Sequence, residues 1–378
     1  MHVGKVLSMC LFFMNDLRKH RFGHERINFE DKQANHYYLK WVEVEEMIDF
    51  TAFDGRVQLV NYVQGSKCVT NKMNLVRSLL GLKEQSPSLD ISFHPRTYLM
   101  ANAQDKSDLS ASLRQGTDKD NRLLIVKPAG RNKGNGIFVA AGSQVKSLLD
   151  KNEKDNGLPE DHIVQEYISR PLLLHGVKFD MRCYAAIVTT APFTAVYWPA
   201  HGYVRTSMTP YADDNYTDLS AHLTNVAIQR KVIQDFDKMA EDSVWDFDRL
   251  QSYLTKKKIA GTRFVTEILK EQMRNIMYHC CRCVEHGSNP TVGQFQLLGF
   301  DLMLDEQLRV HLIEVNRNPD LSTHTSVLRQ VIPPVVEELI CMAAEVHSRQ
   351  VANPGVPIKS AFPMQSMTNA LQLIPPKG

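Results

Sequence analysis

Glu314 and Asn316 stand two residues apart near the end of an apolar run at 308–316, and Asp301 lies in the preceding apolar run at 297–304. Successive side chains of a strand alternate between its faces, so Glu314 and Asn316 are expected on one face, roughly 7 Å apart. Carboxylate and amide oxygens are the ligands that Mg²⁺ takes, usually together with nucleotide phosphates. The three side chains therefore predict a magnesium site, with the outward polar face of a half-exposed hairpin as the alternative.

The register of this hairpin decides whether Asp301 can join the site. A four-residue turn at 306–309 pairs residue 305 with 310, and therefore Asp301 with Glu314. A turn shorter by two residues places Asp301 opposite Leu312, diagonal to Glu314. The even positions of the second strand, from Leu308 to Asn316, are all expected on one face.

A glycine-rich stretch follows another apolar run and could bind phosphate. The run at 123–126 leads into Lys127. After it come glycines, cations and an amide: Gly130, Arg131, Lys133, Gly134, Asn135 and Gly136. Glycines let backbone N–H groups approach phosphates, and the cations neutralise the charge. The stretch has neither the ending of a P-loop nor a G-x-G-x-x-G turn, and a surface hairpin turn is the competing interpretation.

Two further segments carry polar side chains at strand spacing. The segment 165–168 could offer strand edges to an adenine ring. Lys178, Asp180 and Arg182 alternate with apolar residues, so on a strand all three point the same way. One acid between two bases fits a ribose and phosphate site, although a salt-bridged exposed strand has the same pattern.

The elements that must position these groups alternate without a strict βαβ rhythm. One face of a helix over 262–285 is apolar and is formed by Val265, Ile268, Leu269, Met273, Ile276, Cys280 and Val284. Elsewhere the pattern predicts a strand at 57–63, a solvated connection at 101–121, a helix and an acidic loop at 141–161, strands at 163–164 and 184–188, and a helix from about Ser326. This mixture favours an α+β or mixed α/β architecture.

Composition excludes several broad classes of protein. The chain has 378 residues, of which 43% are hydrophobic and 23% charged, enough for a large core in two or three subdomains. A net charge of +2 gives no bulk attraction to nucleic acid or membrane. The sequence contains no run of about 18 apolar residues, so we predict no membrane span, and we predict no signal peptide. The seven cysteines lack the spacing of a disulfide framework, which favours a reducing compartment.

Taken together, the segments resemble the tubulin–tyrosine-ligase-like family, a branch of the ATP-grasp superfamily. The resemblance is carried, in family order, by LVNYVQGSKCVTNKMNLVRSL at 59–79, FHPRTYLM at 93–100, IVKPAGRNKGNGIFV at 125–139, IVQEYISRPLLLHGVKFDMRCY at 163–184, GYVRTS at 202–207, LSAHLTN at 219–225 and FQLLGFDLMLDEQLRVHLIEVNRNP at 295–319. Within the family the chain is most similar to the glycylase branch, through YYLKWVE at 37–43, EDSVWDFDRLQSYL at 241–254 and NRNPDLSTHTSVLRQVIPPVV at 316–336.

The resemblance implies an ATP-grasp fold of the α+β class, in which the nucleotide is held between two α+β subdomains beside a small N-terminal subdomain. On that pattern the chain divides into an N-terminal subdomain at 1–70, a central subdomain at 71–168, a C-terminal subdomain with the Mg²⁺ site at 169–350, and a flexible tail at 351–378. The strand and glycine-rich turn that open the family domain are not found before Lys5, so the N-terminal subdomain is expected to be truncated.

The resemblance also implies roles for individual residues. The phosphates of ATP would be contacted by Lys72 and Lys127 and covered by the loop of Arg131, Lys133, Gly134, Asn135 and Gly136. Adenine and ribose would be held by Gln165, Glu166, Ile168, Lys178 and Asp180, and the ribose and phosphate end would be lined by Thr224 and Asn225. Catalysis at the γ-phosphate and the acyl-phosphate would involve Arg182, Arg205 and Glu314. Mg²⁺ would be bound by Asp301, Glu314 and Asn316.

The implied activity is that of an ATP-dependent protein–amino-acid ligase that uses ATP and Mg²⁺. It would add glycine, as a polyglycylase, to glutamate side chains of tubulin or other acidic proteins through an acyl-phosphate. The alternatives are a glutamylase or tyrosine ligase of the same family, an ATP-grasp ligase for a small metabolite, and an inactive nucleotide- or microtubule-binding scaffold. We expect a monomer of the cytoplasm, cytoskeleton or cilium, without a nucleic-acid or membrane partner.

Overall fold

The computed structural model describes residues 37–113, 122–131, 134–151, 157–190, 194–198, 201–212, 214–233, 236–287, 291–354 and 372–373. The start of the predicted N-terminal subdomain, including the position of its missing strand and turn, lies outside these ranges. Most of the predicted tail and the candidate site residue Lys133 also lie outside them.

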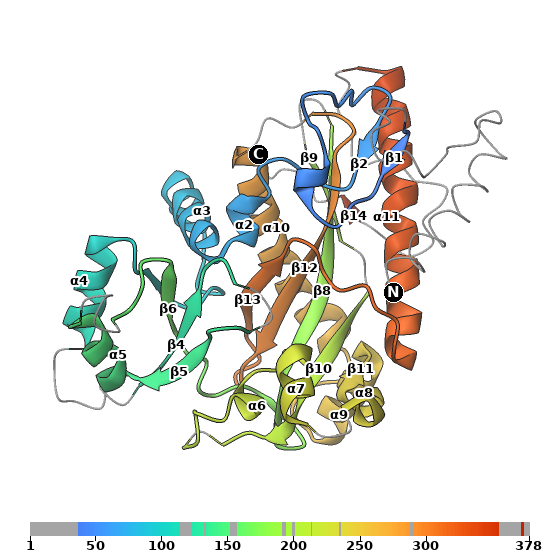
Figure 1. Cartoon of the computed structure of the whole chain (residues 1–378). Coiled ribbons are helices and arrows are strands. Elements are labelled where there is room, and N and C mark those ends of the chain that lie inside the picture. The colour runs from blue at the N-terminus through green and yellow to red at the C-terminus, as the bar shows by residue number, and fades with distance from the viewer. Residues whose placement is uncertain are drawn as a thin grey trace.

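A large antiparallel sheet forms the centre of the molecule (Figure 1). Its main path runs in the order β11 (Val244–Trp245), β10 (Gly202–Pro210), β8 (Val177–Thr189), β12 (Phe295–Leu304) and β13 (Val310–Asn316). The shorter strands β7 (Leu173–Leu174) and β9 (Thr194–Trp198) pair with β8, and β14 (Gln372–Leu373) pairs with β9.

Strand β8 contributes to two cores and to the candidate site. Its odd-numbered side chains, from Phe179 to Ile187, are buried in the larger core. On the other face, Tyr184, Ala186 and Val188 belong to a second core. Lys178, Asp180 and Arg182 precede them on that same face, so the predicted alternation along the strand is confirmed.

Helices cover both faces of the large sheet. The long helix α11 (Ser326–Ala352), which begins where the sequence predicts, packs over the second core and runs along the right of Figure 1. The larger core is closed by α2 (Lys67–Thr70), α3 (Lys72–Gln85), α9 (Phe247–Lys256), η4 (Phe264–Leu269) and α10 (Lys270–Gly287).

The helix predicted over 262–285 departs from α-helical spacing at its start. Residues Phe264–Leu269 form a π-helix, and α10 follows. Val265 and Leu269 are buried, but Ile268 is 53% exposed. The prediction that Ile268 belongs to the apolar face is therefore wrong, because the wider π-helical turn shifts the angular position of each residue.

A smaller sheet lies to the left of the large one in Figure 1. Its order is β3 (Thr97–Leu99), β6 (His162–Glu166), β4 (Leu123–Pro128) and β5 (Phe138–Ala141), and it carries α4 (Ala103–Ser112) and α5 (Gly142–Leu149). The solvated connection predicted at 101–121 is wrong over α4. The Asn102 side chain caps this helix by accepting from the N–H groups of Gln104 and Asp105, and Leu109 is buried.

The remaining elements are short. Strands β1 (Leu39–Lys40) and β2 (Leu59–Val60) pair in parallel, so the strand predicted at 57–63 is present only in part. The other segments are η1 (Glu45–Met47), α6 (Leu219–His222), α7 (Val226–Val232) and α8 (Phe236–Ser243). Within the described ranges, no helix combines the length and the apolar character that a membrane crossing requires.

Candidate active site

A cleft between the two sheets brings together most of the residues predicted from the sequence. It is lined by Lys72, Lys127, Arg131, Gly134, Gln165, Glu166, Ile168, Lys178, Asp180, Arg205, Thr224, Asn225, Asp301 and Glu314. Among the described residues, Asn135, Gly136, Arg182 and Asn316 were predicted for the site but do not line this cleft.

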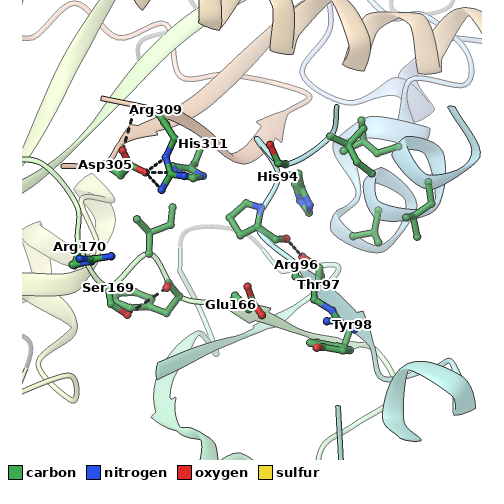
Figure 2. Close-up of a pocket in the computed structure, with 18 of the residues that line it drawn as sticks. His94, Arg96, Thr97, Tyr98, Glu166, Ser169, Arg170, Asp305, Arg309 and His311 are labelled. Atoms are coloured by element: carbon green, nitrogen blue, oxygen red, sulfur yellow. Dashed lines mark hydrogen bonds and ion pairs between the residues drawn. The ribbon is translucent and has the colours of Figure 1, made fainter. Parts of the chain in front are cut away.

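The turn that joins β12 to β13 is tighter than the four-residue turn predicted. The backbone N–H of Asp305 donates to the carbonyl of Arg309, and Leu308 adopts a positive φ of 62°. The buried Asp305 carboxylate accepts from the N–H groups of Gln307 and Arg309, from the Arg309 guanidinium and from His311 (Figure 2). These bonds stabilise the tighter turn, so the predicted pairing next to the turn is wrong.

A β-bulge nevertheless restores the predicted pairing of the two carboxylates. Next to the turn Leu302 pairs with Leu312, but one residue earlier Asp301 pairs with Glu314. Ile313 is therefore the extra residue of the second strand, where the ladder shifts by one position. The expectation that Asp301 lies beside Glu314 is confirmed, although through a tighter turn and a bulge.

The bulge also changes which side chains share a face. Leu312 and Val315 both pack in the larger core, whereas Glu314 lines the cleft. A regular strand would place Leu312 and Glu314 on the same face, so the prediction of one face for all even positions is wrong. Asn316 Nδ2 donates to Asp301 Oδ2 at 3.2 Å, which ties the end of β13 to β12.

Two arginines and two aspartates form a buried network at the base of the cleft. Arg182 Nε donates to Asp301 Oδ1 at 2.5 Å, and Arg205 donates to both oxygens of Asp180 at 2.7 and 2.6 Å. Arg205 also lies 3.0 Å from Asp301, and Thr224 donates to Asp180 at 2.7 Å. Burial alone would raise the pKa of Asp301, but the two guanidinium charges outweigh it and hold that pKa below its ordinary value.

The oxygen atoms of this region fit a magnesium ion by their chemistry. The Glu314 side chain is 27% exposed, and Lys72 Nζ lies 3.4 Å from its carboxylate. The Asn316 amide nitrogen is bonded to Asp301, which leaves its carbonyl oxygen as a possible ligand. Both Asp301 oxygens already accept hydrogen bonds from Arg182. Glu314 and Asn316 therefore have the less engaged oxygens for a hard cation, although only Glu314 and Asp301 line the cleft, and Asp301 is the most heavily engaged.

Lysines approach the cleft from several elements. Lys127, on β4, donates to Gln165 at 2.6 Å, and Lys178, on β8, donates to Tyr167 at 2.6 Å. Lys72 begins α3. Burial lowers the pKa of Lys127 to about 8 and that of Lys178 to about 7. Buried ammonium groups are costly unless an anion compensates them, so the cleft favours a strongly anionic ligand.

Two glycines of the glycine-rich loop have backbone geometry that favours glycine, and one of them lies close to α7. Gly134 and Gly136 have positive φ values of 72° and 76°. A Cβ atom at Gly134 would lie 2.4 Å from Cδ1 of Ile228, so no larger residue fits without movement. Lys231, also on α7, lies 3.5 Å from the Asn135 side chain. The backbone geometry fits the predicted loop that closes over phosphates.

Several residues of the cleft were not singled out by the sequence. Its walls include apolar side chains that could enclose a flat base, namely Ile125, Ile137, Leu223, Met303 and Ile313. Tyr167 and His222 also line the cleft. Both stand inside segments already noted, but only the fold places their side chains together.

A second groove lies on the other side of the segment 166–168, which lines both cavities. Its volume is about 770 Å³, and its walls come from α3, β3 and the turn between β12 and β13. Figure 2 shows Asp305, Arg309 and His311 at one end of this groove and Arg96 at another. The groove has no signature in the sequence, because its residues come from separate segments of the chain.

Comparison with known proteins places the sequence in one family. A model described as "Tubulin-tyrosine ligase family" matches residues 51–352. The chain belongs to the tubulin-tyrosine ligase family. The predicted resemblance is thereby confirmed, and the matched range includes every predicted site residue.

Individual relatives in the tubulin-tyrosine ligase family carry several names. Protein polyglycylase TTLL10 of Macaca fascicularis is 28% identical over 375 residues, covering 85% of this chain and 59% of the relative. Inactive polyglycylase TTLL10 of Homo sapiens is 27% identical over 382 residues, covering 87% and 55%. Tubulin polyglutamylase ttll6 of Danio rerio is 28% identical over 319 residues, covering 80% and 38%. The chain thus spans 59% or less of the length of each of these relatives.

Proposed function

We propose that the chain is an ATP-dependent ligase of the ATP-grasp fold that adds glycine to glutamate side chains of tubulin or another acidic protein. The observation that carries the proposal is the cleft itself. Buried Lys127 on the small sheet and buried Lys178 on the large sheet line the same cleft as the carboxylate of Glu314 on the large sheet. Cations and oxygen ligands gathered in one cleft are what a bound Mg²⁺–ATP requires.

In the proposed arrangement ATP lies between the sheets, with its base against the apolar walls near 166–168. This corresponds to a central subdomain at 71–168 and a C-terminal subdomain at 169–350, flanked by the segments 1–70 and 351–378. Lys127, Lys72 and the glycine-rich loop would neutralise the phosphates. Mg²⁺ held by Glu314 and Asn316, with Asp301, would stabilise charge on the phosphoryl group during transfer.

The proposed reaction proceeds in two steps. A carboxylate oxygen of the acceptor attacks the γ-phosphorus of ATP, the bond to the leaving oxygen of ADP breaks, and an acyl-phosphate forms. The neutral amine of glycine then attacks the acyl carbon, phosphate leaves, the amine loses its proton and an amide bond results. Positioning and charge neutralisation supply most of the catalysis, so no side chain needs to act as a nucleophile.

The two arginines predicted to act at the γ-phosphate and the acyl-phosphate are placed differently. Arg205 lines the cleft and can approach the acyl-phosphate, although it also contacts Asp180 and Asp301. Arg182 is 7% exposed, does not line the cleft and binds Asp301. We therefore propose that Arg205 contacts the reacting groups and that Arg182 acts by holding Asp301 in place.

A relative named as inactive makes catalytic competence a question for experiment. In this chain Lys127, Lys178, Asp301, Glu314 and Asn316 all occupy the positions expected for a working site, and this supports an active enzyme over a nucleotide-binding scaffold. The names of the relatives favour glycine as the added amino acid, with glutamate as the alternative. Because one relative is named as a tubulin polyglutamylase, we propose a cytoskeletal or ciliary location.

Mass spectrometry of the acceptor tests the proposal directly. Purified chain is incubated with ATP, Mg²⁺ and tubulin or acidic peptides, and glycine, glutamate and tyrosine are offered separately. We expect mass increments of glycine on glutamate side chains, together with release of ADP and phosphate. Mass increments of glutamate, and not of glycine, would show that the chain is a polyglutamylase. ATP binding without any amino-acid transfer would favour the scaffold.

Arg205→Ala tests whether this side chain contacts the acyl-phosphate. Because a guanidinium can bind two oxygens at once, its loss should affect the acyl-phosphate more than the bound nucleotide. We expect turnover to fall by about 100-fold, with ATP affinity changed far less. A variant that loses only ATP affinity would place Arg205 in the nucleotide pocket instead.

A further inference from the structure

A chain of hydrogen bonds leads from the cleft to a neighbouring loop through two side chains that have no role in the proposed reaction. Lys178 Nζ donates to Tyr167 Oη at 2.6 Å, and the same oxygen lies 2.6 Å from His222 Nδ1. His222 Nε2 lies 3.1 Å from each of the carbonyl oxygens of Ala212 and Asn215. Lys178 and His222 are 2% and 1% exposed, so water competes little for these bonds.

The contacts of His222 fix its tautomer. Carbonyl oxygens only accept hydrogen bonds, so Nε2 must carry the hydrogen and donate to Ala212 and Asn215. In the neutral ring Nδ1 is then an acceptor, and Tyr167, which also hydrogen-bonds to Tyr211, can donate its hydroxyl hydrogen to it over 2.6 Å. The Tyr167 oxygen remains to accept from Lys178. Burial, with the nearby charge of Lys178, lowers the pKa of His222 and so supports the neutral ring.

Aromatic rings also surround the ammonium group, but they do not orient it. Lys178 Nζ lies 4.2 Å from the ring centroid of Tyr167 and 5.7 Å from that of Tyr211. The Tyr211 ring lies 5.1 Å from His222. Attraction between a cation and a ring face tolerates many orientations, whereas a hydrogen bond has a preferred direction. The Tyr167 hydroxyl is therefore the group that sets where the ammonium points.

We propose that His222 is a positioning residue of the nucleotide site, which orients the Tyr167 hydroxyl through Nδ1 so that this hydroxyl holds the Lys178 ammonium for the nucleotide. The inference rests on the proposed function in one respect, that ATP is the ligand of the cleft. The competing role is purely structural: His222 would only hold the backbone of Ala212 and Asn215 through Nε2.

Two substitutions of His222 separate these roles. In His222→Asn the amide oxygen can take the place of Nδ1 and accept from Tyr167, while the donor to the loop carbonyls is lost. In His222→Gln the longer side chain brings an N–H group to the place of Nε2, while the acceptor for Tyr167 is lost. We expect ATP affinity near that of the wild type for the Asn variant and about tenfold weaker for the Gln variant.

Tyr167→Phe tests the next link of the chain. It keeps the ring beside Lys178 and removes only the hydroxyl, so ATP affinity should again fall about tenfold, with the KM for ATP affected more than kcat. The double variant Tyr167→Phe/His222→Gln should be no weaker than either single variant, because both changes break the same chain. Tyr216→Phe is the matched control, since Tyr216 follows Asn215 in the chain but its hydroxyl donates to Gln144 at 3.2 Å.

Calorimetric titration of ATP into each purified variant, with its melting temperature, completes the experiment. If ATP affinity were near that of the wild type in His222→Gln and impaired in His222→Asn, His222 would only hold the backbone at Ala212 and Asn215. That result would overturn the proposal. Equal loss in both variants with lowered melting temperatures would do the same. A wild-type chain that bound no ATP would instead refute the proposed function, and this result is distinct from an altered ranking.

Discussion

Glu314 is the carboxylate on which the proposed metal site depends most. It lines the cleft beside the bulge, and its accessible oxygens contrast with those of Asp301, which are bonded to arginine. In Glu314→Gln the charge is lost while the shape is kept. We expect ligation to fall by about 100-fold or more, because phosphoryl transfer loses several kcal/mol of charge stabilisation. Turnover of ATP and acceptor, measured together, checks the result.

The matched control is Glu306→Gln at the neighbouring turn. Glu306 is 43% exposed, pairs with Arg170 and lies outside the cleft lining. An exposed pair of this kind contributes little, so the control should ligate at close to the wild-type rate. If Glu314→Gln ligated as well as this control, the metal assignment would be refuted.

The depressed pKa of Lys127 predicts a proton linked to nucleotide binding. Burial lowers this pKa from 10.5 to about 8, so above pH 8 the free protein has largely lost the proton. Phosphate charges favour the protonated form and raise the pKa again, so ATP binding at pH 8.5 should take up a proton. Calorimetry in two buffers of different ionisation enthalpy measures this uptake.

Lys127→Met keeps the length of the side chain but cannot be protonated. Its proton uptake at pH 8.5 should be smaller than that of the wild type, and its ATP affinity at pH 7 should be weaker by about tenfold or more. Unchanged affinity would mean that Lys127 is only a structural residue at the end of β4.

Residue type and spacing singled out candidate residues, and the resemblance to a family supplied their roles. Lys127, Lys178 and Glu314 all reach the cleft, and each follows or interrupts apolar residues. Arg182 was predicted to contact the reacting groups, but its side chain binds Asp301 and does not line the cleft. Sequence spacing shows the face on which a side chain lies, but not the partner that engages it there.

At the scale of elements, the glycine-rich loop offers a clear comparison of two glycines. Gly134 has a positive φ and a Cβ there would meet Ile228, whereas a Cβ at Gly130 would have no atom within 4 Å. Gly134→Ala should therefore displace the loop and weaken ATP binding about tenfold, since the strained backbone costs about 1–2 kcal/mol. Gly130→Ala should bind ATP normally. Equal affinities in the two variants would argue against a role for this loop in closing over phosphates.

The β12–β13 hairpin shows what an element-level prediction can and cannot supply. Apolar runs and the intervening polar residues identified both strands, and the pairing of Asp301 with Glu314 was correct. The tight turn is bonded to the Asp305 side chain, and the bulge at Ile313 lets both Leu312 and Val315 pack in the core. Both arise from contacts that alternation does not encode, and the π-helix at Phe264–Leu269 is missed for the same reason.

For the whole molecule, the acceptor should be recognised through local charge. The chain carries a net charge of only +2, so attraction to an acidic protein must come from cations around the cleft. We expect acidic peptides to be preferred and their KM to rise between about 50 and 200 mM salt, where the screening length is near 10 Å. Ligation assays with acidic and neutral peptides at several salt concentrations test this. Equal use of both peptides without salt dependence would favour a small-metabolite substrate.

The mixed helix and sheet architecture was predicted, but the arrangement of the sheets was not. Hydrophobic periodicity locates strands one at a time, and it contains no information about which distant strands become neighbours. In the large sheet β8 pairs with β10 on one edge and with β12, far along the chain, on the other. The cleft exists because of those distant pairings, so its walls could be foreseen only through resemblance to a known family.

The pairing of β8 with β12 has a consequence for synthesis on the ribosome. Strand β8 emerges long before β12, and until then its edge from Met181 to Val188 has no partner strand and the core around it is incomplete. Unpaired edges and exposed apolar surface promote aggregation, so the nascent chain needs protection during this interval. In a chain that ends before Phe295, through a premature stop or a skipped exon, strand β8 would never gain this partner. Such a truncated chain should therefore be found with chaperones or in the insoluble fraction, and not as a folded fragment.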